Sequence, residues 1–319
     1  MYKYIRFMIN IEKIKSKKTT QELLEFGMIN IDKPSGPTSF DVSDFVRKKL
    51  DLRKTSHFGT LDPKVTGVLP IALNRACKLT GFFLGENKEY IGIMRIHEDI
   101  DFNKIKDVIK KKFLGKIMQK PPIKSRVARI EREREIINFE ILEKKEKDIV
   151  FKAEVQGGTY IRKLIDDLGK ELGIGAHMLE LRRIRAGIFG EYGIFFADKK
   201  HKAGIIKEDD KDYPSTNLYD FEKAVDEYKS GKEENLKKII IPGEIVAELY
   251  PTINVKKEII NKLFNGSPIF IKDLEKKENK TKGRICVFSE DKFIGIYSII
   301  NEKEIFAKPE FVLQPIKEK

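Results

Sequence analysis

The sequence predicts an α+β protein with a larger mixed domain followed by a small, mostly β domain. Strand-like and helix-like runs alternate over about residues 30–190, and two adjacent β-type runs at 136–143 and 149–156 are separated by a charged turn. Short β-type runs also dominate the chain from about residue 249 onwards. At 319 residues the chain is long enough for two domains and a sizeable core.

The composition indicates a soluble globular protein, and its charge leaves two explanations open. The chain is 40% hydrophobic and 35% charged, and 63 Lys and Arg residues against 50 Asp and Glu residues give a net charge of +13. Such an excess favours nucleic acid, although a lysine-rich composition also reflects codon bias. The charge alone therefore does not decide between the two explanations.

Cysteine, histidine and apolar patterns exclude several classes of protein. Cys77 and Cys286 lie far apart and the four histidines are scattered, so we expect neither a disulfide framework nor a metal site. No apolar run approaches the length of a membrane span, and the N-terminus lacks the apolar core of a signal peptide. We expect an intracellular protein.

The N-terminal part predicts an extension, a strand and a helix. Residues 1–26 mix apolar residues and lysines without a clear period, which indicates a segment that is flexible or packs on another domain. Residues 28–34 predict a strand that ends in a turn rich in Pro and Gly. Thr38 with Asp41 resembles a capping box, at the start of a helix that runs to about Leu50.

The middle of the chain predicts strands at 68–72, 90–96, 136–143 and 149–156, and helices at 78–84 and 103–116. Two adjacent prolines exclude regular structure at 119–125. The clearest helix follows Gly157-Gly158-Thr159, with one apolar stripe made of Ile161, Leu164, Ile165, Leu168 and Leu172. A second helix or turn is predicted at 178–185.

The C-terminal part predicts a charged surface excursion over 199–235 that includes a helix at about 218–229. Beyond it, the sequence predicts a helix at 256–264, stopped by Asn265-Gly266, and β-type runs at 269–271, 284–289 and 293–299.

A single carboxylate, Asp62, stands out within residues 57–67, between two glycines that permit tight turns. Pro63 restricts the backbone of Asp62 to an extended conformation. Taken alone, this pair indicates a helix N-cap followed by its first residue, because Asp and Pro favour those positions. The other blocks of the chain favour a functional role.

Six blocks in order resemble the TruB family of pseudouridine synthases: Lys33–Ser39, His57–Gly67, Lys88–Tyr90, Gln119–Ser125, Gly157–Arg162 and Ala176–Arg183. The short distance from Tyr90 to Pro121 and the connector at 216–251 resemble the dyskerin-like branch of archaea and eukaryotes. The last segment resembles a PUA domain, an RNA-binding module that follows the catalytic domain in this family.

The resemblance implies a fold and a reaction. It implies an extension over 1–26 that packs on the PUA domain, a catalytic domain over 27–247 built on a central antiparallel sheet, and a PUA domain over 248–319. The implied reaction isomerises uridine to pseudouridine within RNA and requires no cofactor. The implied location is the cytoplasm of an archaeal cell, or the nucleolus of a eukaryotic one.

The resemblance also assigns roles to site residues. Asp62 is the nucleophile or base, and Arg162 is the cation that keeps it charged, because a guanidinium pairs bidentately with a carboxylate. Tyr90 stacks on the target uracil, His57 contacts the RNA backbone or displaces the base, and Leu181 packs against the base.

Each role has a plainer alternative: a solvated helix arginine for Arg162, a core aromatic for Tyr90, a loop histidine bonded to a carbonyl for His57 and a core leucine for Leu181. Lys33 and Pro34 are expected to support the active-site loop rather than to contact RNA, and His177 is expected to be structural. Basic residues form a predicted RNA track: Lys120, Lys124, Arg126, Arg129, Arg182, Arg183 and Arg185.

The dyskerin-like branch implies work in an H/ACA ribonucleoprotein, in which a guide RNA selects the uridine. The implied partners are the target and guide RNAs, a small zinc-containing protein, a Gar-type protein and a kink-turn-binding ribosomal-type protein. One alternative is a guide-independent tRNA pseudouridine-55 synthase. Another is a non-catalytic RNA-binding scaffold, although such a scaffold has no chemical need for Asp62, Tyr90 and Arg162 together.

Overall fold

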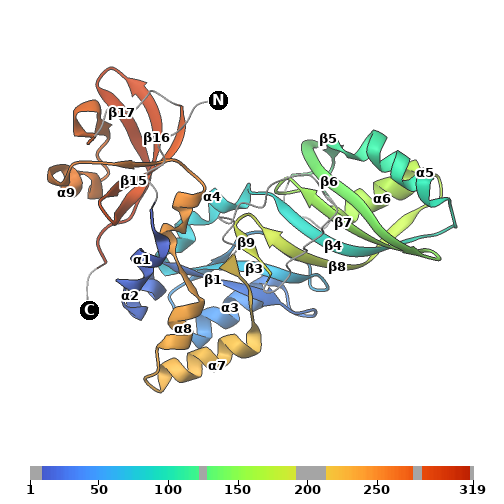
Figure 1. Cartoon of the computed structure of the whole chain (residues 1–319), viewed down its shortest axis with the longest axis horizontal. Helices are drawn as coiled ribbons and strands as arrows, with labels where there is room; N and C mark the ends of the chain where they lie inside the picture. Colours follow the sequence, from blue (N-terminus) through green and yellow to red (C-terminus); the bar gives the residue numbers. More distant parts are fainter. Residues whose placement is uncertain (1–8, 122–127, 192–212, 276–281, 317–319) are drawn as a thin grey trace. The chain divides into compact units, whose positions relative to one another are not determined.

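A computed structural model describes residues 9–121, 128–191, 213–275 and 282–316, which fall into two compact units (Figure 1). The larger unit comprises Ile29–Ala72 and Thr80–Ile239. The smaller unit comprises Met1–Met28, Leu73–Leu79 and Ile240–Lys319. We describe each unit by itself, and the domain boundaries predicted from the sequence remain predictions.

A large, mainly antiparallel sheet forms the larger unit, with the strand order β11-β1-β3-β8-β4-β7-β6-β5. These strands are β1 (Gly27–Lys33), β3 (Thr66–Leu73), β4 (Lys88–Ile96), β5 (Gly115–Gln119), β6 (Arg132–Lys145), β7 (Asp148–Val155), β8 (Ala176–Ala186) and β11 (Thr216–Asn217). Strand β8 is antiparallel to β4 and parallel to β3. The sheet thus brings the strand that follows the Asp62 loop beside β8.

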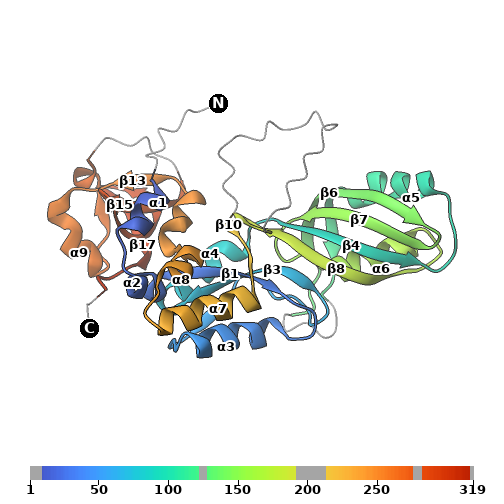
Figure 2. The same cartoon turned by 60° about the horizontal axis from the view of Figure 1, so that its bottom comes forward.

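Short elements extend this sheet and cover it. The remaining strands of the larger unit are β2 (Thr55–His57), β9 (Phe189–Gly190) and β10 (Tyr213–Pro214), while β12 (Ile240–Pro242) belongs to the smaller unit. The helices are α3 (Ser39–Lys49), α4 (Thr80–Leu84), α5 (Phe102–Val108), a π-helical turn (Ile109–Phe113), α6 (Ile161–Glu171), α7 (Leu218–Lys229) and α8 (Glu234–Ile239). Helices α3 and α7 run side by side, with Phe45 and Phe221 in edge contact (Figure 2).

Two of these helices begin or pack as the sequence predicts. Thr38 caps α3, because its hydroxyl accepts from the Asp41 amide while the Asp41 carboxylate accepts from the Thr38 amide. Helix α6 buries its apolar stripe and packs against β8. This packing brings the first turn of α6 near the parallel strand pair β3 and β8.

The smaller unit contains a five-stranded sheet and short helices. Its strands, in the order β13-β15-β16-β17-β14, are β13 (Thr252–Asn254), β14 (Ile269–Phe270), β15 (Gly283–Ser289), β16 (Lys292–Glu302) and β17 (Ile305–Val312). Its helices are α1 (Ile11–Ser16), α2 (Thr20–Glu25), α9 (Ile260–Phe264) and 3-10 turns at Asn74–Leu79, Gly243–Glu248, Lys257–Ile259 and Ile271–Asp273.

The N-terminal segment packs within this smaller unit. Lys13 and Lys17 pair with Asp291 at 3.1 and 2.5 Å, and the Phe26 ring stacks on Phe293 and Phe311 with centroids 6.0 Å away. Residues 11–25 form two short helices rather than a segment without a clear period, and Asn10 caps the first while Thr19 and Glu22 form a capping box at the start of the second.

Several predicted elements are wrong or incomplete. Residues 178–185 form part of strand β8 rather than a helix or turn, because pairing with β4 on one side and β3 on the other outweighs local preference. The helix predicted at 103–116 ends at Phe113, since Gly115 has a φ of +80° and starts β5. Strand β17 was not predicted, and part of the irregular 119–125 segment lies outside the described residues.

Within the parts of the chain that the structure describes, no helix is both long and apolar enough to cross a membrane.

Candidate active site

Asp62 and Arg162 meet at the surface of the larger unit. The Arg162 Nη1 lies 3.3 Å from the Asp62 Oδ2, and the two side chains are 53% and 52% exposed. Asp62 comes from the loop between β2 and β3, and Arg162 from the first turn of α6. Two residues 100 positions apart in the sequence therefore form an ion pair that stays open to solvent.

The loop around Asp62 is held from its buried side by Lys33. This lysine is fully buried at the end of β1, and its Nζ donates to the carbonyl oxygens of Pro34 at 2.7 Å and Pro63 at 3.0 Å. The Pro63 carbonyl also accepts from the Gly36 amide at 2.9 Å. Burial lowers the Lys33 pKa, and the Asp41 and Asp62 carboxylates oppose this change.

A second anchor fixes the residue before Asp62. The hydroxyl of buried Ser39, in the first turn of α3, accepts from the Leu61 amide at 2.8 Å and lies 3.0 Å from the Leu61 carbonyl oxygen. The Asp62 carbonyl then accepts from the Val65 amide at 2.9 Å, which closes a turn around Pro63. The backbone on both sides of the Asp62 carboxylate is thus fixed by hydrogen bonds.

Arg183 fixes the two ends of the same loop. Its side chain is 1% exposed, and its Nε donates to the Val68 carbonyl at 2.8 Å while its Nη2 donates to the Gly59 carbonyl at 3.1 Å. At Gly67, where φ is +101°, a side chain would place its Cβ 2.1 Å from the Arg183 carbonyl oxygen. Only glycine therefore allows β3 to approach β8 here.

Burial and repulsion between cations lower two pKa values near this arginine. Buried Lys88 donates to the Leu84 carbonyl at 2.8 Å, and burial together with Arg183 lowers its pKa to about 8. Burial, with a smaller contribution from Arg183, also lowers the pKa of His57. His57 is therefore neutral at pH 7, and its buried Nδ1 has no hydrogen-bond partner among the described residues.

Tyr90 and Leu181 lie on the neighbouring strands β4 and β8. Tyr90 is largely covered and faces Arg183 across the strand pair, next to a bulge that leaves Ile184 without a partner on β4. Leu181 is buried opposite Gly92 and lines a surface hollow together with Arg162. Bulges next to active sites commonly change the direction of side chains. Here neighbouring residues of β4, Tyr90 and Glu89, pair with Arg183 and Arg185, and Ile184 is the extra residue between them.

The predicted RNA track is wrong at Arg183, which is buried and bound to backbone carbonyls. Arg182 pairs with Asp32 at 2.8 Å and with Glu191, and Arg185 pairs with Glu89 at 3.1 Å. Lys124 and Arg126 lie outside the described residues. The track is therefore supported by fewer free cations than the sequence suggested.

The structure brings Asp62, Arg162 and Leu181 into one area and places Lys33 and Pro34 at the base of the Asp62 loop. The sequence does not reveal the anchoring contacts of Ser39 and Arg183. The glycine at 67 could have indicated a close backbone approach, but not which residue approaches. Among the described residues, no three His, Cys, Asp or Glu side chains gather into a possible metal site.

The site thus combines one carboxylate open to solvent, a guanidinium paired with it and a loop fixed from its buried side. The TruB family pseudouridylate synthase N-terminal domain matches residues 47–161, and the tRNA pseudouridylate synthase B C-terminal domain matches residues 162–225. The chain belongs to the TruB family of pseudouridine synthases. It is an RNA pseudouridine synthase, as the sequence blocks predicted.

Curated relatives are similar over most of their length. A probable tRNA pseudouridine synthase B of Archaeoglobus fulgidus is 37% identical over 291 residues, which cover 90% of this chain and 80% of the relative. The protein with the same description from Methanocaldococcus jannaschii is 38% identical, over 82% of this chain and 71% of the relative.

Solved structures show the same fold. A chain from the crystal structure of a Cbf5-Nop10-Gar1 complex superposes with a TM-score of 0.80 at 33% identity, over 94% of this chain and 89% of that chain. A chain from an H/ACA RNP bound to a substrate RNA containing 2′-deoxyuridine gives a TM-score of 0.78 at 32% identity, over 94% of this chain and 89% of that chain. The predicted α+β fold is confirmed.

Proposed function

We propose that this enzyme is the catalytic subunit of a guide-RNA-directed H/ACA ribonucleoprotein that isomerises selected uridines in ribosomal or transfer RNA. The observation that carries this proposal is the likeness, over 94% of the chain, to proteins solved in a Cbf5-Nop10-Gar1 complex and in an RNA-bound H/ACA RNP. The net charge of +13 suits an RNA partner. The proposed partners are the guide and target RNAs and accessory proteins of the Nop10 and Gar1 kinds.

The proposed reaction centre is Asp62. The N1–C1′ bond of uridine breaks, the uracil turns, and a C5–C1′ bond forms. The proton lost from C5 balances the proton gained at N1, so the reaction needs no oxidant or co-substrate. Positive charge develops at C1′ when the glycosidic bond weakens, and a carboxylate stabilises this charge whether it acts as nucleophile or base.

Arg162 is the proposed partner that keeps this carboxylate ionised. A base turned out of its stack covers the site and removes water from Asp62, which by itself raises the pKa of a carboxyl group. A guanidinium 3.3 Å away opposes that change because it remains protonated. Since half of each side chain is exposed without RNA, this interaction gains strength when the uridine enters.

The remaining predicted residues surround this centre. We propose that Tyr90 stacks on the uracil, that Leu181 supports it from β8, and that neutral His57 contacts the RNA or helps to displace the base. Lys33 and Pro34 hold the loop and do not touch RNA, which agrees with the buried ammonium group bonded to two carbonyls.

A second candidate function is guide-independent modification of transfer RNA. The description of the curated relatives as probable tRNA pseudouridine synthase B favours it. The two candidates share the chemistry at Asp62 and differ in how the uridine is selected.

The test compares two substrates under the same conditions. The full chain is incubated with a target RNA, in the presence and absence of a complementary H/ACA guide and accessory proteins, and with a bare tRNA TΨC stem-loop. The primary proposal expects conversion of the target only with the guide. Conversion of the stem-loop alone, with no guide-dependent activity, would favour the second candidate and reject the first.

A further inference from the structure

A surface hollow adjoins the Asp62–Arg162 pair. It has a volume of about 370 Å³, within the range of sites that bind small ligands. Its lining comes from the loop after Asp62, from helix α6 and from the first half of β8: Lys64, Val65, Arg162, Asp166, Ala176, His177, Met178, Leu179 and Leu181. Because Arg162 and Leu181 belong to it, the hollow continues the proposed reaction centre.

A β-bulge shapes its apolar wall. Ile93 of β4 pairs with Glu180 and the next residue, Met94, pairs with Met178, so Leu179 has no partner on β4. Neighbouring residues of a regular strand point to opposite faces, and a bulge interrupts this alternation. As a result Met178 and Leu179 both line the hollow, and Leu179 is 39% exposed. This wall offers an apolar surface for a flat base.

The charges around the hollow leave a positive excess. Asp166 is already paired with Lys170 at 2.7 Å and with Lys163 at 3.5 Å, and hydrogen bonds from these lysines lower its pKa. Lys64 is exposed and forms no ion pair with any residue that the structure describes. A free ammonium group next to an apolar wall matches a nucleotide, whose phosphate binds lysine without regard to sequence.

A second histidine fixes the polar side of the hollow. The Nδ1 of His177 lies 2.9 Å from the Nε2 of His97, at the end of the neighbouring strand β4. This hydrogen bond sets the orientation of the His177 ring and leaves its Nε2 for a ligand. A Cβ at Gly175 would lie 2.6 Å from the His97 Nδ1, so glycine is needed where the chain passes His97.

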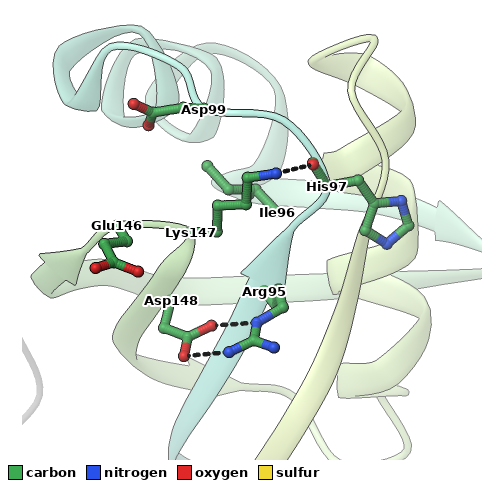
Figure 3. Close-up of a pocket in the computed structure, with 7 residues that line it drawn as sticks. All are labelled: Arg95, Ile96, His97, Asp99, Glu146, Lys147 and Asp148. Atoms are coloured by element: carbon green, nitrogen blue, oxygen red, sulfur yellow. Dashed lines mark hydrogen bonds and ion pairs between the residues drawn. The ribbon is translucent and has the colours of Figure 1, made fainter.

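His97 is in turn anchored by backbone contacts. Its amide donates to the Gly175 carbonyl at 3.1 Å, and its carbonyl accepts from the Lys147 Nζ at 2.8 Å. Figure 3 shows its ring turned away from the charged side chains of the adjoining hollow. In that second hollow both cations are already bound, since Arg95 pairs with Asp148 through two contacts of 2.6 and 2.7 Å and Lys147 donates to the His97 carbonyl. A phosphate therefore binds more favourably in the hollow that contains Lys64.

We infer that the Lys64 hollow holds the nucleotide next to the target uridine, with its phosphate at Lys64 and His177 and its base against Met178 and Leu179. The inference rests on the proposed reaction centre at Asp62. Extraction of the uridine from its stack leaves the neighbouring base without a stacking partner. A site for that neighbour offsets the loss and sets where the strand enters, so His177 and Lys64 bind RNA while His97 is a positioning residue.

The test removes one phosphate charge at a time. The target RNA is whichever RNA the wild-type chain converts in the experiment above, prepared with an uncharged methylphosphonate on either the 5′ or the 3′ side of the uridine. One of the two replacements is expected to raise KM about tenfold and to leave kcat within about twofold, because the contact is made equally before and during the reaction.

The Lys64→Ala variant makes the test specific. It is expected to raise KM for the unmodified RNA about tenfold. The methylphosphonate that raises KM in the wild type should raise the KM of this variant by less than about twofold, because the two changes remove the same contact. The exposed Lys104 on α5 provides the matched control: Lys104→Ala loses the same charge and should keep the full methylphosphonate effect.

The histidine pair gives a second readout. His177→Ala should raise KM about threefold. The double variant His97→Ala/His177→Ala should have the same KM as His177→Ala, since His97 acts only through His177. The inference is overturned if neither methylphosphonate changes KM of the wild type, or if the sensitive one acts equally on Lys64→Ala. Because the wild type converts the unmodified RNA in every arm, such a result counts against the hollow and not against the enzyme activity.

Discussion

The loop that carries Asp62 has two unlike sides. On the outer side, Asp62 and Arg162 are half exposed and meet through one contact of 3.3 Å. On the inner side, Lys33 and Arg183 are fully buried and bind four backbone carbonyls. Exposed ion pairs contribute little to stability, whereas buried donors that satisfy carbonyls are costly to remove. Activity and stability should therefore depend on different sides of the same loop.

The largest difference between the effect on activity and the effect on stability is expected for Asp62→Asn. This change keeps the shape of the side chain and removes its negative charge, so we expect no detectable conversion of uridine, a loss of at least about 10⁴-fold. RNA affinity and the free energy of unfolding should stay close to those of the wild type, since the contact with Arg162 is exposed. Conversion is measured by the release of tritium from C5-labelled RNA, and normal turnover would refute the role of Asp62.

A change on the inner side of the loop should lower stability rather than act directly on the reaction. Arg183→Met leaves the Val68 and Gly59 carbonyls without a donor, and we expect a loss of about 3 kcal/mol in the free energy of unfolding. Arg185→Met is the matched control on the same strand, because Arg185 is partly exposed, and it should cost less than about 1 kcal/mol. Urea denaturation compares the two, and equal losses would contradict the anchoring role of Arg183.

Arg162 should affect activity with little effect on stability. We expect Arg162→Ala to lower kcat about 100-fold, because the Asp62 carboxylate then loses the cation that lies 3.3 Å from it. Arg162→Lys keeps the charge and should recover part of the activity, and both variants should unfold within about 0.5 kcal/mol of the wild type. The comparison of kcat for the wild type, Arg162→Ala and Arg162→Lys is the decisive measurement, and a wild-type kcat in Arg162→Ala would contradict the assignment.

The smallest effect concerns His57, the last residue of β2. Its pKa is lowered in the folded chain, so below about pH 6.5 the unfolded chain binds more protons than the folded one. Stability therefore falls as the pH drops through this range. We expect His57→Asn to weaken that dependence, as measured by urea denaturation between about pH 7.5 and pH 5. An unchanged dependence would show that other groups dominate.

Local patterns allowed part of the fold and of the site to be predicted. The capping box at Thr38 and Asp41 and the apolar stripe of α6 are set by contacts three or four residues apart, so the sequence reveals them. The same holds for the β6–β7 hairpin, whose turn is adjacent to its strands. The segment at 178–185 was misread, because its partners β3 and β4 lie about 80 to 120 residues away in the sequence.

By itself the sequence determined the family, through six blocks in a fixed order, and with it the class of reaction, while the role of Asp62 is the prediction that follows from them. Only the tertiary structure decided which cations are free for RNA and which hold the loop. Arg183 and Lys64 are both basic residues within the six blocks, yet one is buried against carbonyls and the other is exposed without an ion pair among the described residues. Charge is a property of the residue, but its availability depends on burial and on partners that long-range strand pairing supplies.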